Sequence, residues 1–162
     1  MSAVKIREQL QPGDLGEVTR LHGTVYVEGH GHGISFEAYV AAGLGEFYHQ
    51  YDPDRDRVWL CEDGENLVGM LFLMHRDQAA QLRYFLVLPD YRGSGLGKEL
   101  MRRYMQALDE LGYDHSFLWT TSELATAASL YTRHGFRLTE ERPSTRFGKP
   151  LVEQKYEWHR AS

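Results

Sequence analysis

The sequence has little of what disulfide-bonded, membrane-spanning or nucleic-acid-binding proteins depend on. Its single cysteine, Cys61, cannot form an internal disulfide, which fits a reducing compartment and predicts a cytoplasmic protein. The longest apolar run, residues 68–74, is too short to span a bilayer, and the first residues lack the apolar block of a secretory signal. With 18 basic and 23 acidic side chains the formal net charge is −5. We therefore expect no membrane and no nucleic-acid partner.

The composition that remains is that of one ordinary globular domain. The chain has 162 residues, of which 42% are hydrophobic and 25% are charged. At roughly 150 residues per domain, this length predicts a single domain over residues 1–162. A domain of this size can bury enough surface to fold without a structural metal or a disulfide.

Hydrophobic periodicity predicts strands and helices in the order βααβββαβαββ, a mixed α/β or α+β sheet with helices on both faces. The glycine-rich stretch at residues 28–33 predicts a loop, and Ser35 predicts the N-cap of the second helix. The expected strands are residues 4–8, 57–62, 66–75, 82–88, 115–121, 136–139 and 152–158. The expected helices follow residues 14, 35, 95 and 122.

The most informative segment runs from residue 87 to residue 98, where a buried strand is followed by a glycine-rich loop and a long helix. Three glycines in five residues let backbone N–H groups approach a bound anion, and the helix N-terminus adds partial positive charge. Arg92 and Lys98 supply full positive charge at the two ends of the loop. The pattern suits a pyrophosphate. It matches neither a Walker A loop, which would need Ser or Thr at Glu99, nor the Rossmann glycine spacing.

The loop Arg92-Gly93-Ser94-Gly95-Leu96-Gly97 resembles the acyl-CoA loop Arg/Gln-x-x-Gly-x-Gly/Ala of the GNAT N-acetyltransferase superfamily. The likeness continues downstream at residues 127–136, which read Ala-Ala-Ser-Leu-Tyr-Thr-Arg-His-Gly-Phe. A narrower likeness, in His22-Gly23-x-x-Tyr26, residues 118–120 and residues 147–154, is to the acetyltransferase half of bacterial MarR-type regulator–acetyltransferase fusions. Because the winged-helix half is missing, the chain would be a free-standing relative.

The resemblance implies a mostly antiparallel sheet of about seven strands, which opens into a V between the fourth and fifth strands. Acetyl-CoA would lie in this opening as co-substrate, and a backbone N–H near Leu86 or Val87 would stabilise the oxyanion. Tyr131 occupies the position that in many relatives donates a proton to the departing CoA thiolate. The implied cofactor-binding residues are Leu86, Val87, Arg92, Gly93, Ser94, Gly95, Leu96, Gly97 and Lys98.

The general base is harder to assign. Many relatives carry a glutamate on the fourth strand, but residues 82–88 contain no carboxylate. Glu28 is the carboxylate that could take the role of the general base, and His30 or a water chain are the alternatives. His22, His30 and His32 show no zinc-ligand spacing, so we expect no metal and loop histidines that face water, or one that touches substrate.

The sequence therefore predicts an acetyl-CoA-dependent N-acetyltransferase that moves an acetyl group to a primary amine by direct attack. The acceptor is a small molecule or a peptide, and the net acidity of the chain favours a cationic amine. The alternative is a non-catalytic acyl-CoA sensor that keeps the loop without the chemistry. Pairing of C-terminal strands between subunits would allow a homodimer.

Overall fold

The computed structural model describes residues 4–30, 33–122 and 125–161, with the side chains of residues 26–30 and 125–126 excepted. Seven strands form one sheet in the order β1-β2-β3-β4-β5-β7-β6. All neighbours pair antiparallel except β4 and β5, which pair parallel. The strands are β1 Lys5–Arg7, β2 Arg57–Asp63, β3 Asn66–Arg76, β4 Ala79–Val87, β5 His115–Thr121, β6 Arg137–Ser144 and β7 Leu151–His159. The predicted element order is confirmed.

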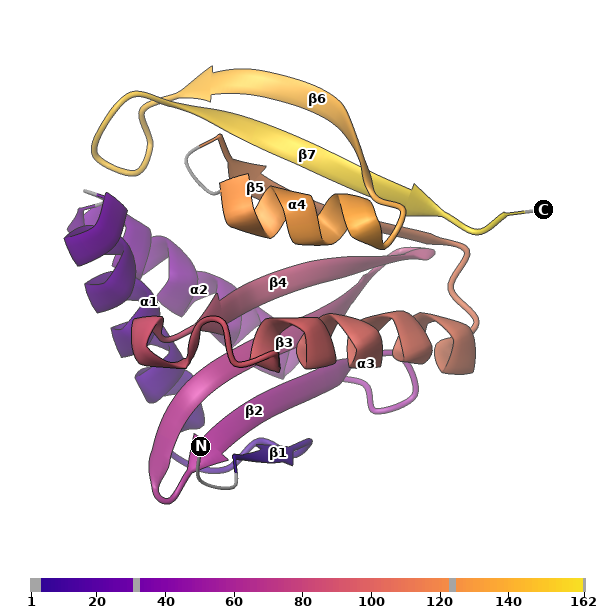
Figure 1. The fold of residues 1–162 in the computed structure, drawn as a ribbon, viewed down its shortest axis with the longest axis horizontal. Helices are drawn as coiled ribbons and strands as arrows, with labels where there is room; N and C mark the ends of the chain where they lie inside the picture. Colours follow the sequence, from indigo (N-terminus) through magenta and orange to yellow (C-terminus); the bar gives the residue numbers. More distant parts are fainter. Residues whose placement is uncertain (1–3, 31–32, 123–124, 162) are drawn as a thin grey trace.

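Helices cover both faces of the sheet, as expected (Figure 1). The helices α3 (Leu96–Leu111) and α4 (Ala125–Arg133) pack on one face, and α1 (Asp14–His30) and α2 (Ile34–His49) pack on the other. A short 3-10 turn, η1 (Pro89–Tyr91), precedes α3. No helix in the described part of the chain is long and apolar enough to cross a bilayer.

The helix α3 behaves as its sequence pattern predicts. Its apolar stripe, which includes Leu100, Tyr104 and Leu108, is completely buried against the sheet. The Tyr104 hydroxyl forms a 2.7 Å hydrogen bond with Ser116 of β5, so the one polar atom of that stripe is satisfied. Gly112 ends the helix with φ of 79°, a left-handed conformation that glycine adopts without strain.

Three local predictions are wrong. The helix α1 continues to His30, into the stretch expected to be a loop. Gly33 rather than Ser35 is the N-cap of α2, and the Gly33 N–H donates to the Phe147 carbonyl at 3.1 Å. The strand β6 extends to Ser144, well beyond the expected end, because β7 pairs with it along its length.

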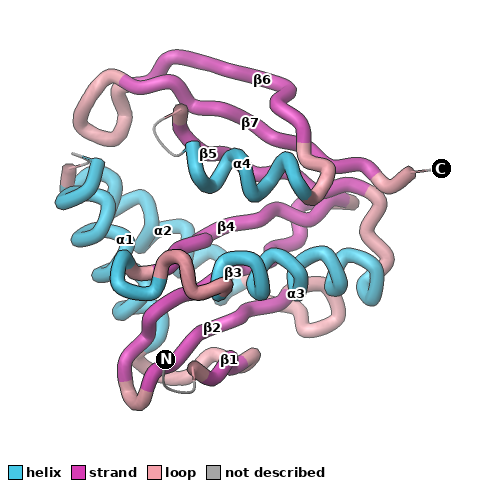
Figure 2. The backbone as a smooth tube through the Cα atoms, in the orientation of Figure 1, coloured by secondary structure: helices cyan, strands magenta, loops and turns pink. Residues whose placement is uncertain are grey.

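The strands β4 and β5 pair only where Ala80 and Gln81 meet Ser116 and Phe117. Beyond these two pairs the strands separate, and Figure 2 shows them close together at one end and apart at the other. The edge of β4 that faces β5 is therefore without a strand partner from residue 82 to residue 87, within the described residues. The expected V-shaped opening is present.

Candidate active site

A bulge in β4 shapes the wall of this opening. Tyr84 has φ of 57°, in the left-handed region that residues other than glycine rarely adopt. The pairing with β3 shifts there, because Met70 is opposite Leu86 while Phe72 is opposite Arg83. An extra residue in one strand bends it and disrupts the regular alternation of its side chains.

The consequence is that Arg83 and Tyr84, although adjacent, both lie on the α2 side of the sheet. A Cβ built on Gly43 of α2 would lie 2.3 Å from the Tyr84 hydroxyl oxygen and 2.8 Å from Arg83 Nη2. The next residue, Phe85, faces the other side, with its ring 6.1 Å from that of Tyr131 in α4.

The glycine loop connects the end of β4 to α3 and has the geometry of an anion site. Gly93 and Gly95 have φ of 81° and 89°, and Gly95 is the N-cap of α3. The Arg92 Nε donates to the Val87 carbonyl at 3.2 Å, which holds the start of the loop against β4. The first N–H groups of a helix have no intrahelical acceptor, so those of α3 are available to a ligand.

Two cations flank this loop. Arg92 and Lys98 are both exposed, and no carboxylate in the described ranges forms an ion pair with either. Glu99, the acid of the first turn of α3, is paired instead with Arg102 and Arg103, and these hydrogen bonds lower its pKa to about 2. Positive charge therefore remains free where a pyrophosphate would sit.

Other contacts fix the loop in place. The Tyr91 hydroxyl donates to the Asp63 carboxylate in the β2–β3 hairpin, and the Ser94 hydroxyl donates to the Tyr91 carbonyl at 2.6 Å. A Cβ on Gly97 would be in ordinary contact with Phe85 and Leu130, so the start of α3 packs closely on β4 and α4.

A cavity of about 140 Å³ lies in the opening between β4 and β5, and its lining residues come from both faces of the sheet. Its walls come from α1, α2, the β4 bulge, the end of β5, α4, the β6–β7 loop and β7. Tyr131 lines it and is 4% exposed, with Phe136 and Tyr156 at centroid distances of 6.2 and 6.1 Å. An acyl group in the split strands would therefore come close to the tyrosine expected from the sequence.

Polar groups of the cavity carry both signs of charge. Glu153 of β7 is 3% exposed and accepts a hydrogen bond from Arg146 at 2.9 Å, with Arg142 at 3.7 Å. Arg83 also lines the cavity. The hydroxyls of Tyr84 and Thr121 are buried, and neither has a hydrogen-bond partner in the structure as described.

Of the two expectations for His22, exposure to water from a loop is wrong, and contact with substrate stays a prediction. His22 lies in α1, is 3% exposed and lines the cavity. Burial lowers its pKa to about 4, and the nearby Arg83 charge acts in the same direction. The ring is therefore neutral at pH 7. Burial likewise raises the pKa of Tyr84 to about 12, so its hydroxyl keeps its proton.

The other expected site residues divide into two groups. Leu86 and Val87 lie at the end of β4, and the loop from Arg92 to Lys98 leads into the start of α3; their role in binding a cofactor stays a prediction. Glu28 and His30 belong to the last turns of α1, and their side chains lie outside the described residues. Cys61 is completely buried, and burial raises the pKa of its thiol to about 12, which makes it a poor nucleophile.

Sequence reasoning missed Arg83, Arg146 and Glu153 as cavity residues. No motif marks them, since the bulge and the β6–β7 loop bring them together from distant parts of the chain. Tyr84 and Trp119 also line the cavity.

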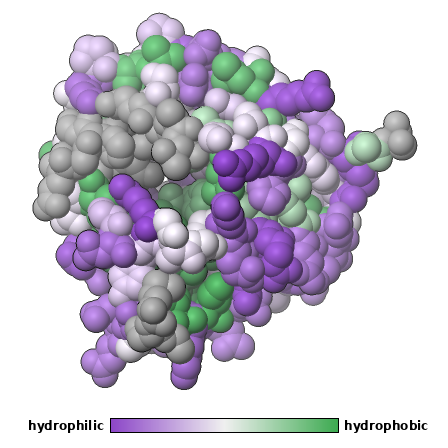
Figure 3. All heavy atoms as spheres, viewed as in Figure 1, coloured by the Kyte–Doolittle hydropathy of each residue, from purple (hydrophilic) through white to green (hydrophobic). Residues whose placement is uncertain are grey.

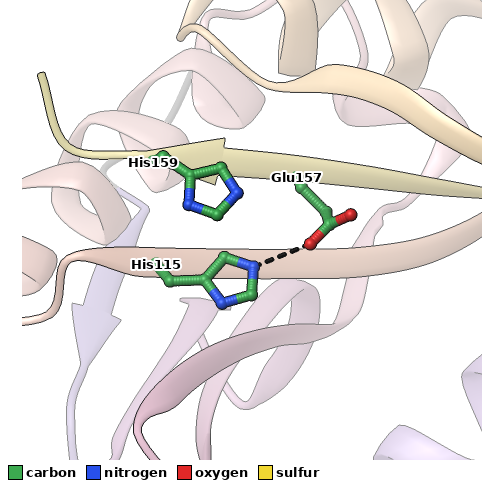
Figure 4. Close-up of side chains that lie close together, drawn as sticks. All are labelled: His115, Glu157 and His159. Atoms are coloured by element: carbon green, nitrogen blue, oxygen red, sulfur yellow. Dashed lines mark hydrogen bonds and ion pairs between the residues drawn. The ribbon is translucent and has the colours of Figure 1, made fainter.

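One group of side chains outside the cavity could hold a metal ion. The ligand atoms of His115, Glu157 and His159 lie within 4.8 Å of one another on β5 and β7 (Figure 4). His115 Nε2 is 2.8 Å from Glu157, and the two imidazole rings are stacked at 4.4 Å with an angle of 5°. Lone pairs in parallel rings do not converge on one ion, so this geometry is that of a stacked pair with a carboxylate. The prediction that no metal is required stays a prediction.

The face formed by α3 and α4 is mostly hydrophilic (Figure 3). Apolar atoms come to its visible surface only in small patches, which is ordinary for a protein surface. The predicted homodimer gains no support from this face and stays a prediction.

Comparison with solved structures shows what class of fold this is. A putative acetyltransferase of the GNAT family from Desulfovibrio desulfuricans superposes with a TM-score of 0.75 at 19% identity, over 98% of this chain and 100% of that chain. A GNAT family acetyltransferase from Elizabethkingia anophelis with acetyl-CoA bound superposes with a TM-score of 0.67 at 13% identity, over 98% and 99%. The chain has the GNAT fold.

Sequence comparison gives the family itself. The acetyltransferase (GNAT) family model matches residues 27–136, and the chain belongs to that family. The chain is 30% identical over 97 residues to the uncharacterized N-acetyltransferase YjgM of Escherichia coli (strain K12). The aligned region covers 57% of this chain and 58% of YjgM. The regions aligned with this chain span 38% to 62% of the length of five curated relatives.

Proposed function

We propose that the protein is an N-acetyltransferase that uses acetyl-CoA to acetylate a primary amine on a small molecule or peptide. The observation that supports this most is the continuity of the site. The glycine loop with two free cations leads into the split between β4 and β5, and the split leads to a cavity lined by Tyr131. Several curated relatives are named N-acetyltransferases, and two structures with the same fold hold acetyl-CoA.

In this proposal the pyrophosphate binds the loop from Arg92 to Lys98, which includes Gly93, Ser94, Gly95, Leu96 and Gly97. The pantetheine arm extends along the unpaired edge of β4, beside Leu86 and Val87. The bulge leaves backbone groups near Tyr84 and Phe85 outside the regular ladder, and an N–H there would stabilise the oxyanion. The proposed oxyanion donor therefore lies slightly earlier in β4 than Leu86 and Val87, the positions that the resemblance implies.

The chemistry requires two proton transfers. An amine of pKa near 10.4 must lose a proton before attack, which costs about 4–5 kcal/mol at pH 7. The departing thiolate, with a thiol pKa near 8.5, is aided by a donor, and Tyr131 is the proposed donor. The amine attacks the thioester carbon directly, the C–S bond breaks, and the CoA thiolate takes a proton from Tyr131. The nitrogen loses one proton as the amide forms, and this proton restores the Tyr131 hydroxyl, so the thiol gains what the amine gives up.

Glu28 remains the base proposed from the sequence, and Glu153 is a second candidate because its carboxylate lines the cavity. Its ion pair with Arg146 favours a structural role instead. The pH–rate profiles of Glu28→Gln and Glu153→Gln separate the two, since only loss of the base removes the acidic limb without abolishing acetyl-CoA binding.

The activity test is release of free CoA thiol from acetyl-CoA on addition of primary amines, with the reaction lacking amine as the blank. The proposal predicts amine-dependent release with wild-type protein and a strong decrease in Tyr131→Phe. Acetyl-CoA binding without turnover on any amine would support the sensor alternative instead.

We also propose, from the residues at 118–120 and 147–154, that the chain is related to the acetyltransferase half of MarR-type fusions. We propose further that the chain forms a single domain and that the protein is located in the cytoplasm. Sedimentation at several concentrations would test the homodimer.

A further inference from the structure

One side chain of the cavity carries a positive charge that no carboxylate among the described side chains balances. No carboxylate of the described residues lies within ion-pair distance of the Arg83 guanidinium. The guanidinium is half-buried and lies over two aromatic rings, with Cζ 5.5 Å from the Tyr39 centroid and 4.7 Å from the Tyr84 centroid. Aromatic faces hold the guanidinium in place but leave its N–H groups without an anionic partner.

A second observation comes from the neighbouring residue. The Tyr84 hydroxyl is buried and has no hydrogen-bond partner among the described residues, and Tyr84 lines the same cavity as Arg83. A buried hydroxyl without a partner is costly, so such groups often await a ligand. Because both groups lie against Gly43, their donors are close to one another.

The charges around these groups give the cavity a positive balance. Arg83 and Arg146 line the cavity, and among the described residues Glu153 supplies its carboxylate. The Glu153 charge is already balanced by the ion pair with Arg146. His22 is neutral. The local charge is thus opposite to the net charge of −5 for the whole chain, from which a cationic acceptor was expected.

We propose that the acceptor amine also carries a carboxylate, as an amino acid does, and that the Arg83 guanidinium and the Tyr84 hydroxyl bind this carboxylate. The inference rests on the proposed function. One guanidinium fork and one hydroxyl match the two oxygens of a single carboxylate. The rings of Phe36, Tyr39 and Phe147, 5.1 to 6.4 Å apart, form an aromatic wall that suits an apolar side chain on the acceptor.

The test compares amino acids with their carboxamides, which keep the amine and side chain but lose the negative charge. Thiol release is measured for phenylalanine against phenylalaninamide and for leucine against leucinamide. A hydrogen-bonded ion pair predicts a kcat/KM about 10- to 150-fold higher for each acid than for its amide. Amides that react as well as the acids overturn the proposal while leaving the acetyltransferase function intact.

Variants assign the effect to the residue. In Arg83→Gln the ratio between acid and amide should fall to within about threefold, and Arg83→Lys should keep part of it because it keeps the charge. Arg20→Gln is the matched control, since Arg20 is an exposed arginine of α1 that is paired with Glu17. Unchanged acetyl-CoA binding in all three variants shows that they fold. Retention of the full ratio in Arg83→Gln overturns the assignment.

A binding measurement covers the case in which no amine of the panel reacts. The probe is 3-phenylpropionate, a carboxylate without an amine, added to protein saturated with CoA. We expect it to raise the melting temperature of wild-type protein and of Arg20→Gln but not of Arg83→Gln. Absence of a shift in wild-type protein rejects the anion subsite. Absence of turnover with a retained shift rejects only the proposed enzymatic function.

Discussion

Gly43 is in direct contact with the groups of the proposed anion subsite, so replacing it by alanine tests their placement. A Cβ there would lie 2.3 Å from the Tyr84 hydroxyl oxygen, whereas a Cβ on Gly45 in the same helix would meet nothing within 4 Å. Alanine is favoured over glycine in a helix by about 1 kcal/mol, so Gly45→Ala should raise the free energy of unfolding by up to that amount.

Gly43→Ala has the same gain in helix propensity but must displace Tyr84 and Arg83. Overpacking of a buried site costs about 1–3 kcal/mol, so Gly43→Ala should be less stable than Gly45→Ala by about that amount. Urea unfolding followed by the fluorescence of the three tryptophans measures both. The acceptor KM should also rise in Gly43→Ala alone.

Tyr84→Phe provides the matching rescue. It removes the oxygen atom that the new Cβ would meet and also removes a buried hydroxyl without a partner, whose burial costs about 1–3 kcal/mol. We expect Tyr84→Phe to be more stable than wild type and to offset most of the Gly43→Ala loss. If Gly43→Ala is as stable as Gly45→Ala, or if Tyr84→Phe gives no rescue, the placement of these side chains is wrong.

Three further predictions concern other parts of the site. Burial lowers the pKa of His22 to about 4, so between pH 6.5 and pH 4 the unfolded chain takes up a proton there that the folded chain does not. The free energy of unfolding should therefore be at its maximum for this group above pH 6.5 and fall by about 3 kcal/mol between pH 6.5 and pH 4. In His22→Gln the midpoint of urea unfolding should depend less on pH over this range. An unchanged pH dependence would contradict the low pKa assigned to His22. Arg92→Ala should weaken acetyl-CoA binding about tenfold or more by calorimetry, while Arg102→Ala, which removes a paired arginine from α3, should not. Tyr131→Phe should lower kcat about 100-fold or more with little change in acetyl-CoA affinity, and an unchanged kcat would remove the tyrosine from the mechanism.

The elements that could be predicted are those whose local pattern decides their structure. The strand β5 and the helix α3 have the predicted bounds, because a short apolar strand and a long apolar stripe between glycines leave little alternative. The glycine loop was predictable for the same reason, since its glycines are required by its own backbone.

The errors arise where distant residues decide the local structure. Gly33 caps α2 because its N–H reaches the Phe147 carbonyl, a contact with a loop more than a hundred residues away. The second half of β6 is exposed and contains Pro143, so no hydrophobic alternation marks it, and only its pairing with β7 defines it.

The anion subsite was hidden for a related reason. Strand alternation places neighbouring side chains on opposite faces of a sheet, so Arg83 and Tyr84 would not be expected to meet at one site. The positive φ of Tyr84 and the bulge cancel that alternation. Nothing in the side-chain pattern of this strand indicates the bulge.

The central claim is that the loop and the split strands bind acetyl-CoA, and thermal unfolding with and without acetyl-CoA tests it most directly. A ligand that binds only the folded protein stabilises it by about 2.7 kcal/mol at 100 times its Kd. For a chain of this size we expect the melting temperature to rise by roughly 5–11 °C, and by less in Arg92→Ala. No shift at millimolar acetyl-CoA would contradict the account, because the glycine loop would then be only a connection between β4 and α3.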